Sequence, residues 1–295
     1  MHAQDLKQLF IPPIYYKIKN RLRMRNQPIG DPLPMRERKG DKMIIIGNGP
    51  SLNKSLEKYK DVICNTECIA VNFFASTDMF KVVRPAVYLL NDNAFFDIPE
   101  NLKSSVDKLL TNIVDNTNWE MTVVLPCTEK KAKLIEILSH NPYIKIIYFN
   151  YVIKQITDIT KRNKAWDNNS IAPPEATVLN VAVWLSLYWG YPETYLIGAD
   201  TSWIEDLKVD QDTNQLYTID RHFYNNSDVY NEKNLINSDE HKRILPNSIY
   251  EELRSITACF KNYEDLENYA KWKGLKVYNA SEYSLIDAFE RKKID

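Results

Sequence analysis

Short apolar runs recur along the chain, and segments with the composition of helices separate them. Residues 43–46 form an uninterrupted apolar run that stops in a glycine-rich turn, as expected for a strand buried on both faces of a parallel sheet. Further strand-like runs lie at residues 67–72, 86–91, 121–125 and 144–149, and helices are expected at 54–59 and 129–139. This alternation predicts an α/β fold with a doubly wound, mostly parallel sheet.

A second informative block is the stretch 177–189, which is apolar at most positions. A helix with so little polar surface belongs inside the protein, so we expect it to pack on the sheet. It leads through Gly190 into a strand-like run that ends at Asp200. This arrangement predicts that the strand of Asp200 lies beside the first strand, with Asp200 at the same carboxyl edge as Asn48.

Residues 202–247 break the pattern, because they are rich in Asp, Asn, Lys and Tyr and have weak periodicity. A long stretch of this kind inside a compact domain is usually functional. A helix at 248–273 and a strand at 275–279 follow it. The sequence therefore predicts a single α/β domain over residues 43–295, with a lid insertion at about 202–247.

The first 42 residues differ in composition from the rest. Nine basic residues between Lys17 and Lys42 outnumber Asp31, Glu37 and Asp41, and apolar and aromatic side chains precede them. A basic amphipathic leader of this type suits an anionic membrane surface. A flexible arm, or an arm folded over the domain, is the alternative.

Composition narrows the class of protein. A chain of 295 residues with a net charge of −1 has no overall attraction to nucleic acid. The four cysteines lack metal-site or disulfide spacing, and no apolar run approaches the roughly 20 residues that span a bilayer. We expect a cytoplasmic protein, bound peripherally to the inner face of the cell membrane if the leader binds lipid.

The turn after the first strand offers chemistry. Gly47 and Gly49 allow close backbone approach or positive φ, Asn48 offers an amide, and Pro50-Ser51 can begin a helix whose free N–H groups attract phosphate. The turn matches neither the dinucleotide fingerprint nor a P-loop, so a turn without a chemical role is the alternative. As a nucleotide site, it predicts that valine at Gly49 abolishes binding and leaves the fold largely intact.

Three features together resemble the bacterial sialyltransferase-like glycosyltransferases, the single-domain kind that uses CMP-sugars. They are the turn I-I-G-N-G-P-S-L at 45–52, the strands that end in Asn72 and Asn91, and the helix, G-Y-x-E, strand, G-x-D block that ends at Asp200. The turn is also similar to that of a domain-of-unknown-function group with hydroxymethylpterin diphosphokinase-like members.

The resemblance implies a GT-A-like Rossmann variant that binds a CMP-linked donor, with an acidic nonulosonate-type sugar as the expected group. It implies a surface glycan, such as lipopolysaccharide, or a lipid-linked acceptor. Thr177 replaces the family's serine at the start of the apolar helix, and Ser202 stands where the family has tyrosine. The implied nucleotide-binding residues are Gly47, Asn48, Gly49, Pro50, Ser51, Asn72, Asn91, Ala176, Thr177, Asp200 and Ser202.

Glycosyl transfer requires stabilisation of a departing phosphate and removal of a proton from the acceptor hydroxyl. Histidine suits the second task because its pKa lies near the operating pH. His222 stands beside Arg221 and Tyr224, which offer a phosphate-pairing cation and a phenol, while His241 lies in a charged run and is the competing base.

A CMP donor needs no metal, and neither a metal nor another cofactor is expected. Asp210 and Asp212 have the D-x-D spacing of a metal site but lie in a polar turn. One alternative is a metal-dependent UDP- or GDP-sugar transferase. Another is a Mg²⁺-dependent pyrophosphokinase or other phosphotransferase that uses Asp92, Asp200 and Asp206. A glycan-binding protein without catalysis is a further alternative.

Overall fold

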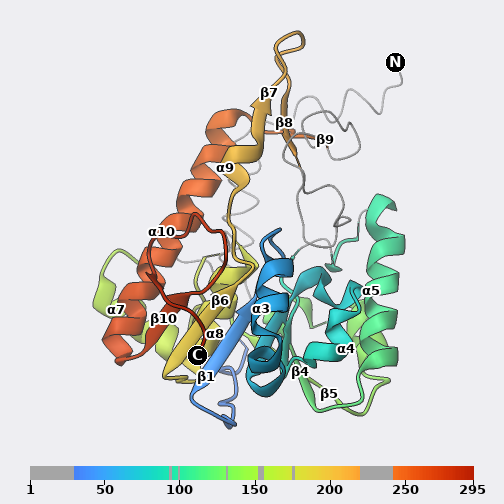
Figure 1. The fold of residues 1–295 in the computed structure, drawn as a ribbon, viewed down its shortest axis with the longest axis vertical. Helices are drawn as coiled ribbons and strands as arrows, with labels where there is room; N and C mark the ends of the chain where they lie inside the picture. Colours follow the sequence, from blue (N-terminus) through green and yellow to red (C-terminus); the bar gives the residue numbers. More distant parts are fainter. Residues whose placement is uncertain are drawn as a thin grey trace.

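The computed structural model describes residues 30–295 with the exception of 93–94, 99, 131, 152–155, 175–176 and 220–241. Within this part of the chain, eight strands form one sheet in which all pairings are parallel. Its order is β11-β10-β6-β1-β2-β3-β4-β5. Figure 1 shows β10, β6 and β1 next to one another. The strands are β1 (Lys42–Ile46), β2 (Glu67–Val71), β3 (Val87–Leu89), β4 (Met121–Pro126), β5 (Ile144–Phe149), β6 (Glu193–Ile197), β10 (Lys276–Asn279) and β11 (Glu290–Arg291).

Helices cover both faces of this sheet, and alternate side chains of each strand supply the two cores. On β1, Ile44 and Ile46 belong to one buried cluster and Met43 and Ile45 to the other. The first cluster includes α3 (Leu52–Asn65), α4 (Met79–Val83), α5 (Lys103–Asn116) and α6 (Lys133–Leu138), and the second α7 (Ile159–Asp167), α8 (Val178–Tyr188) and α10 (Ile249–Lys273). The predicted doubly wound α/β fold is confirmed.

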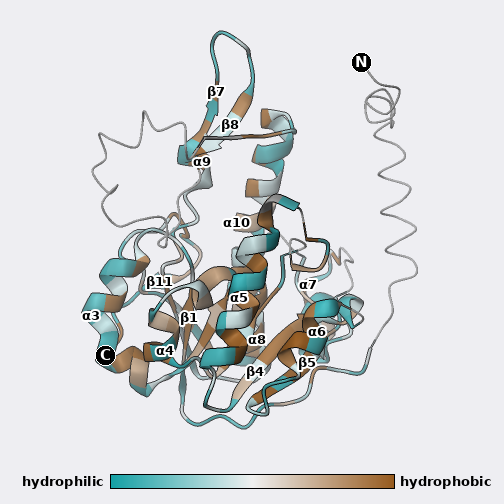
Figure 2. Ribbon diagram, turned by 90° about the vertical axis from the view of Figure 1, so that its right-hand side faces the viewer, coloured by the Kyte–Doolittle hydropathy of each residue, from teal (hydrophilic) through white to brown (hydrophobic). Residues whose placement is uncertain are grey.

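Hydropathy follows this layering. Figure 2 shows hydrophobic colour on the central strands and on α8, and hydrophilic colour on the outer surfaces of α3 and α5. Ten of the eleven residues of α8 are buried, and β6 pairs with β1 directly after it. The expectation that this apolar helix places the Asp200 strand beside the first strand is therefore correct.

Several elements were not expected from the sequence. In the described part of the chain these are α4, α5, α7 and β11, together with the short 3₁₀ turns η1 (Asn72–Ser76), η3 (Glu100–Leu102) and η4 (Cys127–Glu129). The first helix is longer than expected, since α3 continues past a non-helical Tyr59 to Asn65. Most of these elements are too short to leave a periodic pattern in the sequence.

The expected lid region contains more regular structure than its composition indicates. Its described residues form α9 (Trp203–Asp206) and a three-stranded antiparallel sheet of β7 (Leu207–Val209), β8 (Leu216–Ile219) and β9 (Lys242–Ile244). The β7–β8 hairpin projects away from the large sheet in both views (Figures 1 and 2). The remaining residues, 220–241, lie outside the described residues.

The described end of the expected leader, residues 30–42, packs against the domain. Leu33 is buried, donates its N–H to Asn169 Oδ1 at 2.9 Å and accepts a bond from the Tyr188 hydroxyl at 2.7 Å. Arg36 pairs with Glu67 at 2.6 Å, and although burial alone would raise the pKa of Glu67, bonds from Arg36, Lys39 N–H and Tyr191 lower it. A truncation that leaves these contacts intact must end before Leu33, and a chain that begins at Gly30 keeps all of them.

Glycine is required where β1 and β6 end. A Cβ on Gly47 would lie 2.3 Å from the carbonyl oxygen of Gly198, which is itself in the left-handed region at φ 59°. Neither Gly47 nor Gly49 has positive φ, so the close approach of the two strand ends is what excludes larger residues there. The glycines therefore serve the fold, in addition to any ligand.

We predict that Gly47→Ala lowers the free energy of unfolding by about 1–3 kcal/mol, because the methyl group collides with backbone that cannot rotate away. Gly40→Ala is the matched control, since nothing lies within 4 Å of a Cβ at Gly40. Urea denaturation of both variants measures the effect. Equal stability of the two would mean that the strand ends can separate without cost.

Candidate functional site

The reversal of strand order places a ligand-sized opening at the centre of the sheet. The chain winds outward from β1 to β5 and then returns to β6, on the other side of β1. At the carboxyl ends of these two strands, Gly47 N–H donates to Ile197 O and Gly49 N–H to Gly198 O, both at 2.8 Å. Such a switch point is where open α/β sheets bind ligands.

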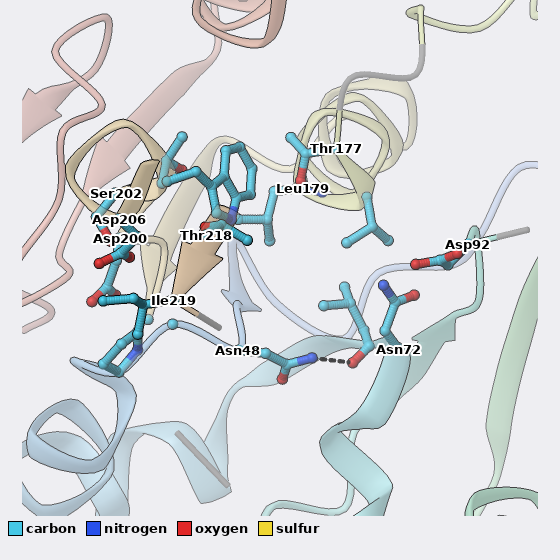
Figure 3. Close-up of a pocket in the computed structure, with 17 residues that line it drawn as sticks. Asn48, Asn72, Asp92, Thr177, Leu179, Asp200, Ser202, Asp206, Thr218 and Ile219 are labelled. Carbon is cyan, nitrogen blue, oxygen red and sulfur yellow. Dashed lines mark hydrogen bonds between the residues drawn. The ribbon is translucent and has the colours of Figure 1, made fainter. Parts of the chain in front are cut away.

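A cavity of about 350 Å³ opens at this point (Figure 3). The ends of β1, β2 and β6, the first turn of α8, α9 and the end of β8 all contribute to its wall. Its lining residues are Asn48, Gly49, Pro50, Val71, Asn72, Asp92, Thr177, Val178, Leu179, Gly198, Asp200, Thr201, Ser202, Trp203, Asp206, Thr218 and Ile219. Residues that are far apart in the sequence therefore line the same cavity.

The start of α3 is already bound to a carboxylate. Ser51 precedes α3 and donates its N–H to Asp200 Oδ2 at 3.0 Å and its hydroxyl to Asp200 Oδ1 at 2.6 Å. Burial raises the pKa of Asp200 to about 6, although the two bonds from Ser51 oppose that rise. Asp200 thus occupies the helix end that the sequence suggested for phosphate.

This contact changes the expected effect of valine at Gly49. A Cβ at that position would lie 2.3 Å from Asp200 Oδ1 and 2.7 Å from Gly198 O. Valine would therefore displace Asp200 and separate the strand ends. The expectation that this substitution leaves the fold largely intact is wrong, because the glycine is packed against protein.

Two asparagines offer hydrogen-bonding capacity along the cavity wall. Asn48 Nδ2 donates to Val71 O at 3.0 Å, as Figure 3 shows, while its Oδ1 has no partner among the described residues. Asn72 has a left-handed backbone, with φ 46°, and its Oδ1 also lacks a partner there. Buried acceptors without partners are rare, so a ligand with hydroxyl or amino donors would suit them.

The first turn of α8 faces the same cavity. Thr177 is its N-cap, and the Thr177 hydroxyl accepts the Leu179 N–H at 3.4 Å. Thr177, Val178 and Leu179 all line the cavity. A helix start with free N–H groups is a favourable place for negative charge. Of the two helices that begin near the switch point, α8 therefore has its start open to the cavity.

The predicted site residues divide into three groups. Asn48, Gly49, Pro50, Asn72, Thr177, Asp200 and Ser202 line the cavity. Gly47, Ser51 and Asn91 do not line it; Ser51 faces Asp200, and Asn91 is buried. Ala176, Arg221, His222, Tyr224 and His241 lie outside the described residues.

The structure also adds residues that sequence reasoning missed, chiefly Thr201, Trp203, Thr218 and Ile219. Thr201 follows Asp200 directly, and that position was a usable signal. Thr218 and Ile219 reach the cavity only because the short strand β8 folds back over the sheet edge.

The two candidate histidines are tethered to the same place. Ile219, a cavity residue, is paired with Lys242 across β8 and β9. His222 follows Ile219 by three positions, and His241 immediately precedes Lys242. The segment that contains both histidines therefore leaves and rejoins the described chain at the paired residues Ile219 and Lys242, and these anchor points do not favour either histidine.

The charged residues that line the described cavity are acidic. Asp200 and Asp206 lie together on one side of it and Asp92 on the opposite side (Figure 3). In the described ranges no lysine or arginine lines the cavity, and no three His, Cys, Asp or Glu side chains are arranged to hold a metal ion. Asp210 of the D-x-D pair accepts bonds from Asp212 N–H and Thr213 N–H at the tip of the β7–β8 hairpin.

Comparisons with known proteins identify a distant structural neighbour. No family model and no curated protein matches the chain. Among solved structures, a MAf glycosyltransferase from Magnetospirillum magneticum AMB-1 aligns over 92% of this chain at 11% identity and a TM-score of 0.49. The chain spans 37% of the length of that protein. A likeness this remote assigns no function, and the resemblance to sialyltransferase-like enzymes stays a prediction.

Among the described residues, none of the helices has the length and apolar character needed to cross a membrane.

The raised pKa of Asp200 predicts a pH-dependent contribution to stability. With a pKa of about 6 in the folded protein against 3.8 for the free side chain, the folded state binds a proton that the unfolded state releases. Stability from this group is therefore present at about pH 4 and is lost as the pH rises to about 6. Relative to Asp200→Asn, which does not titrate, the wild-type chain should lose roughly 2–3 kcal/mol over that window.

Urea denaturation of both proteins at pH 4, 5, 6 and 7 measures this difference, and titrations common to both chains cancel. A difference that stays constant between pH 4 and 6 would show that the pKa of Asp200 is the same in the folded and unfolded protein.

Proposed function

We propose that the protein is a glycosyltransferase that moves a sugar from a CMP-linked donor to a surface glycan or a lipid-linked acceptor. The observation that carries the proposal is the cavity at the β1–β6 switch point, whose wall brings Asn48, Asn72 and Thr177 together. This is where sheets of this kind bind nucleotides. The motif resemblance supports CMP as the nucleotide and an acidic nonulosonate-type sugar as the transferred group.

The donor phosphate is proposed to lie at the start of α8. The start of α3 is occupied by Asp200, whereas the first turn of α8 lines the cavity. The Thr177 hydroxyl and the positive end of the α8 dipole can stabilise the charge that develops on the departing monophosphate. Arg221, which lies two residues after the cavity residue Ile219, is proposed to pair with the remaining phosphate charge.

The acceptor is proposed to bind in an adjoining groove of about 200 Å³ between the small sheet and α10. Trp203 and Thr218 line both the cavity and the groove, so a molecule in the groove lies next to the donor. Glu252 and Ser255 line the groove together with Leu207, Leu245 and Ile256. An indole beside polar groups suits a sugar, which presents both C–H faces and hydroxyls.

We also propose that residues 1–29 attract the enzyme to anionic membranes. Six lysines and arginines and one aspartate lie in this stretch. Each basic residue near such a surface contributes on the order of 1 kcal/mol. Sedimentation with anionic vesicles of the chain that begins at Gly30 measures this contribution, and undiminished binding by that chain would assign the leader another role.

A Mg²⁺-dependent phosphotransferase, or a metal-dependent UDP- or GDP-sugar transferase, is the second candidate. Its support is the charge of the described wall, where Asp92, Asp200 and Asp206 face a site proposed for an anionic nucleotide. A divalent cation would offset that repulsion. Against it stands the geometry, because Asp92 is separated from the other two carboxylates across the cavity (Figure 3).

A thermal-shift panel of CMP, CDP, UDP, GDP and ATP, with and without Mg²⁺, tests both candidates. We expect CMP to raise the melting temperature without metal and more than the other nucleotides. Stabilisation by ATP, UDP or GDP that depends on Mg²⁺ would favour the second candidate. No shift with any nucleotide would contradict both and leave a binding protein for glycans.

For the acceptor proton, we propose His222 as the general base, with Tyr224 beside the leaving group. Arg221 and Tyr224 stand beside His222 and offer a phosphate-pairing cation and a phenol, whereas His241 lies in a charged run. His222→Ala is expected to lower kcat by about 10² to 10⁴ and to leave donor affinity unchanged. Release of CMP from a CMP-linked donor is the measurement.

His241→Ala is the comparison variant and is expected to have a much smaller effect. If His241→Ala is inactive and His222→Ala is not, the two roles must be exchanged. Activity in both variants would exclude a histidine base, and a carboxylate such as Asp206 or Asp220 would be examined next.

A further inference from the structure

The turn that follows β6 is held in an unfavourable backbone conformation. Gly198 has φ 59° and Thr201 has φ 51°, both in the left-handed region. Glycine adopts that region freely, but a β-branched residue such as Thr201 does so only under tertiary constraint. Asp200 lies between the two. The position of the Asp200 carboxylate therefore depends on the tertiary contacts that stabilise this turn.

A segment near the end of the chain supplies those constraints. The Ala199 N–H donates to Ser281 Oγ at 3.0 Å, and the Ser284 hydroxyl donates to the Ala199 carbonyl at 2.6 Å. The Leu285 N–H donates to the Asp200 carbonyl at 2.9 Å. Residues 281–285, here called the clamp, therefore bind the N–H and the carbonyl of Ala199 and the carbonyl of Asp200.

The clamp also reaches α9 and the start of α3. The Tyr283 hydroxyl donates to a carboxylate oxygen of Glu205 in α9, and this bond raises the pKa of Tyr283 to about 12. Glu282 pairs with Lys58 of α3 at 2.5 Å, and the Tyr283 carbonyl lies 3.4 Å from Ser51 Oγ, whose hydrogen is donated to Asp200. The same five residues thus touch the elements on either side of the cavity mouth.

The bond to Glu205 matters because α9 has four residues. A helix this short has no stability of its own, so tertiary contacts must fix its position. It carries Trp203 and Asp206, which line the cavity. The bond from Tyr283 to Glu205 therefore fixes the position of Trp203, which lines both the cavity and the adjoining groove.

We propose that the clamp is a positioning element of the site and that Tyr283 and Ser284 are positioning residues. Ser284 fixes the turn that presents Asp200, and Tyr283 fixes α9 and so places Trp203 and Asp206. The clamp itself is inferred from contacts within the protein. Its effect on ligand rests on the proposed function, because the ligand is taken to be the nucleotide in that cavity.

Tyr283→Phe tests the Tyr283 bond, since it removes only a hydroxyl from a side chain that is 44% exposed. Hydrogen exchange of the peptide that spans residues 198–206 should become on the order of tenfold faster, as loss of one charge-assisted hydrogen bond predicts. Ser284→Ala should accelerate exchange of the same peptide. Tyr250→Phe is the matched control, because Tyr250 is an exposed tyrosine on the first turn of α10. In this variant the peptide that spans residues 198–206 should exchange at the wild-type rate.

Glu205→Gln separates the hydrogen bond of Glu205 from its negative charge. The glutamine side-chain carbonyl can still accept a hydrogen bond from the Tyr283 hydroxyl, but it carries no charge. This variant should retain near wild-type exchange and CMP affinity, whereas Tyr283→Phe should weaken CMP binding on the order of tenfold, measured by calorimetry. Unchanged exchange in both Tyr283→Phe and Ser284→Ala would overturn the clamp. Faster exchange with unchanged CMP affinity would overturn its positioning role.

If the wild-type chain binds no nucleotide, the proposed function fails and the exchange experiment still decides the clamp. The two hypotheses can therefore fail separately.

Discussion

The contact between the ends of β1 and β6 is the constraint on which the site depends. Backbone atoms of Gly47 and Gly49 bond directly to Ile197 and Gly198, at a separation that leaves no room for a Cβ. Because the strands meet this closely, Ser51 reaches Asp200 and the start of α3 is joined to the turn after β6. Gly49 and Gly198 of this junction line the cavity, so the junction forms part of its wall.

Burial of Asp200 has an electrostatic cost that affects how a nucleotide could bind. The carboxylate takes the place at the helix end where an anion would otherwise be favoured, and desolvation raises its pKa to about 6. Asp92 and Asp206 also lie on the described wall, so a phosphate bound in the cavity needs positive partners near it. The start of α8 is one partner within the described chain, and Arg221 or a divalent cation is the further partner under the two proposed functions.

The remainder of the site is built from parts with little stability of their own. The short helix α9 and the three short strands of the small sheet carry Trp203, Thr218 and Ile219 to the cavity. Their positions come from contacts with longer elements, including α10 and the clamp, and not from local propensity. The junction of β1 and β6 is fixed by backbone contacts within the large sheet, whereas these parts of the wall depend on neighbouring elements.

The sequence by itself determined the elements that bury large apolar surfaces. The apolar runs of β1 to β6 and the apolar α8 are recognisable from the hydrophobic pattern of the sequence. The long α10 begins with a capping box at Ser248. The sequence also located Asn48, Asn72, Thr177 and Asp200, because residues that follow parallel strands or begin their helices gather at one edge.

Only the tertiary structure decided what those residues touch. That Ser51 binds Asp200, that Gly49 is packed against protein and that Thr218 faces the cavity all depend on pairs separated by many residues in sequence. The strands of the small sheet have three or four residues and no periodic signature, so their pairing is fixed by long-range contacts. Sequence patterns report burial along one element, whereas hydrogen bonds between elements arise only when the fold brings them together.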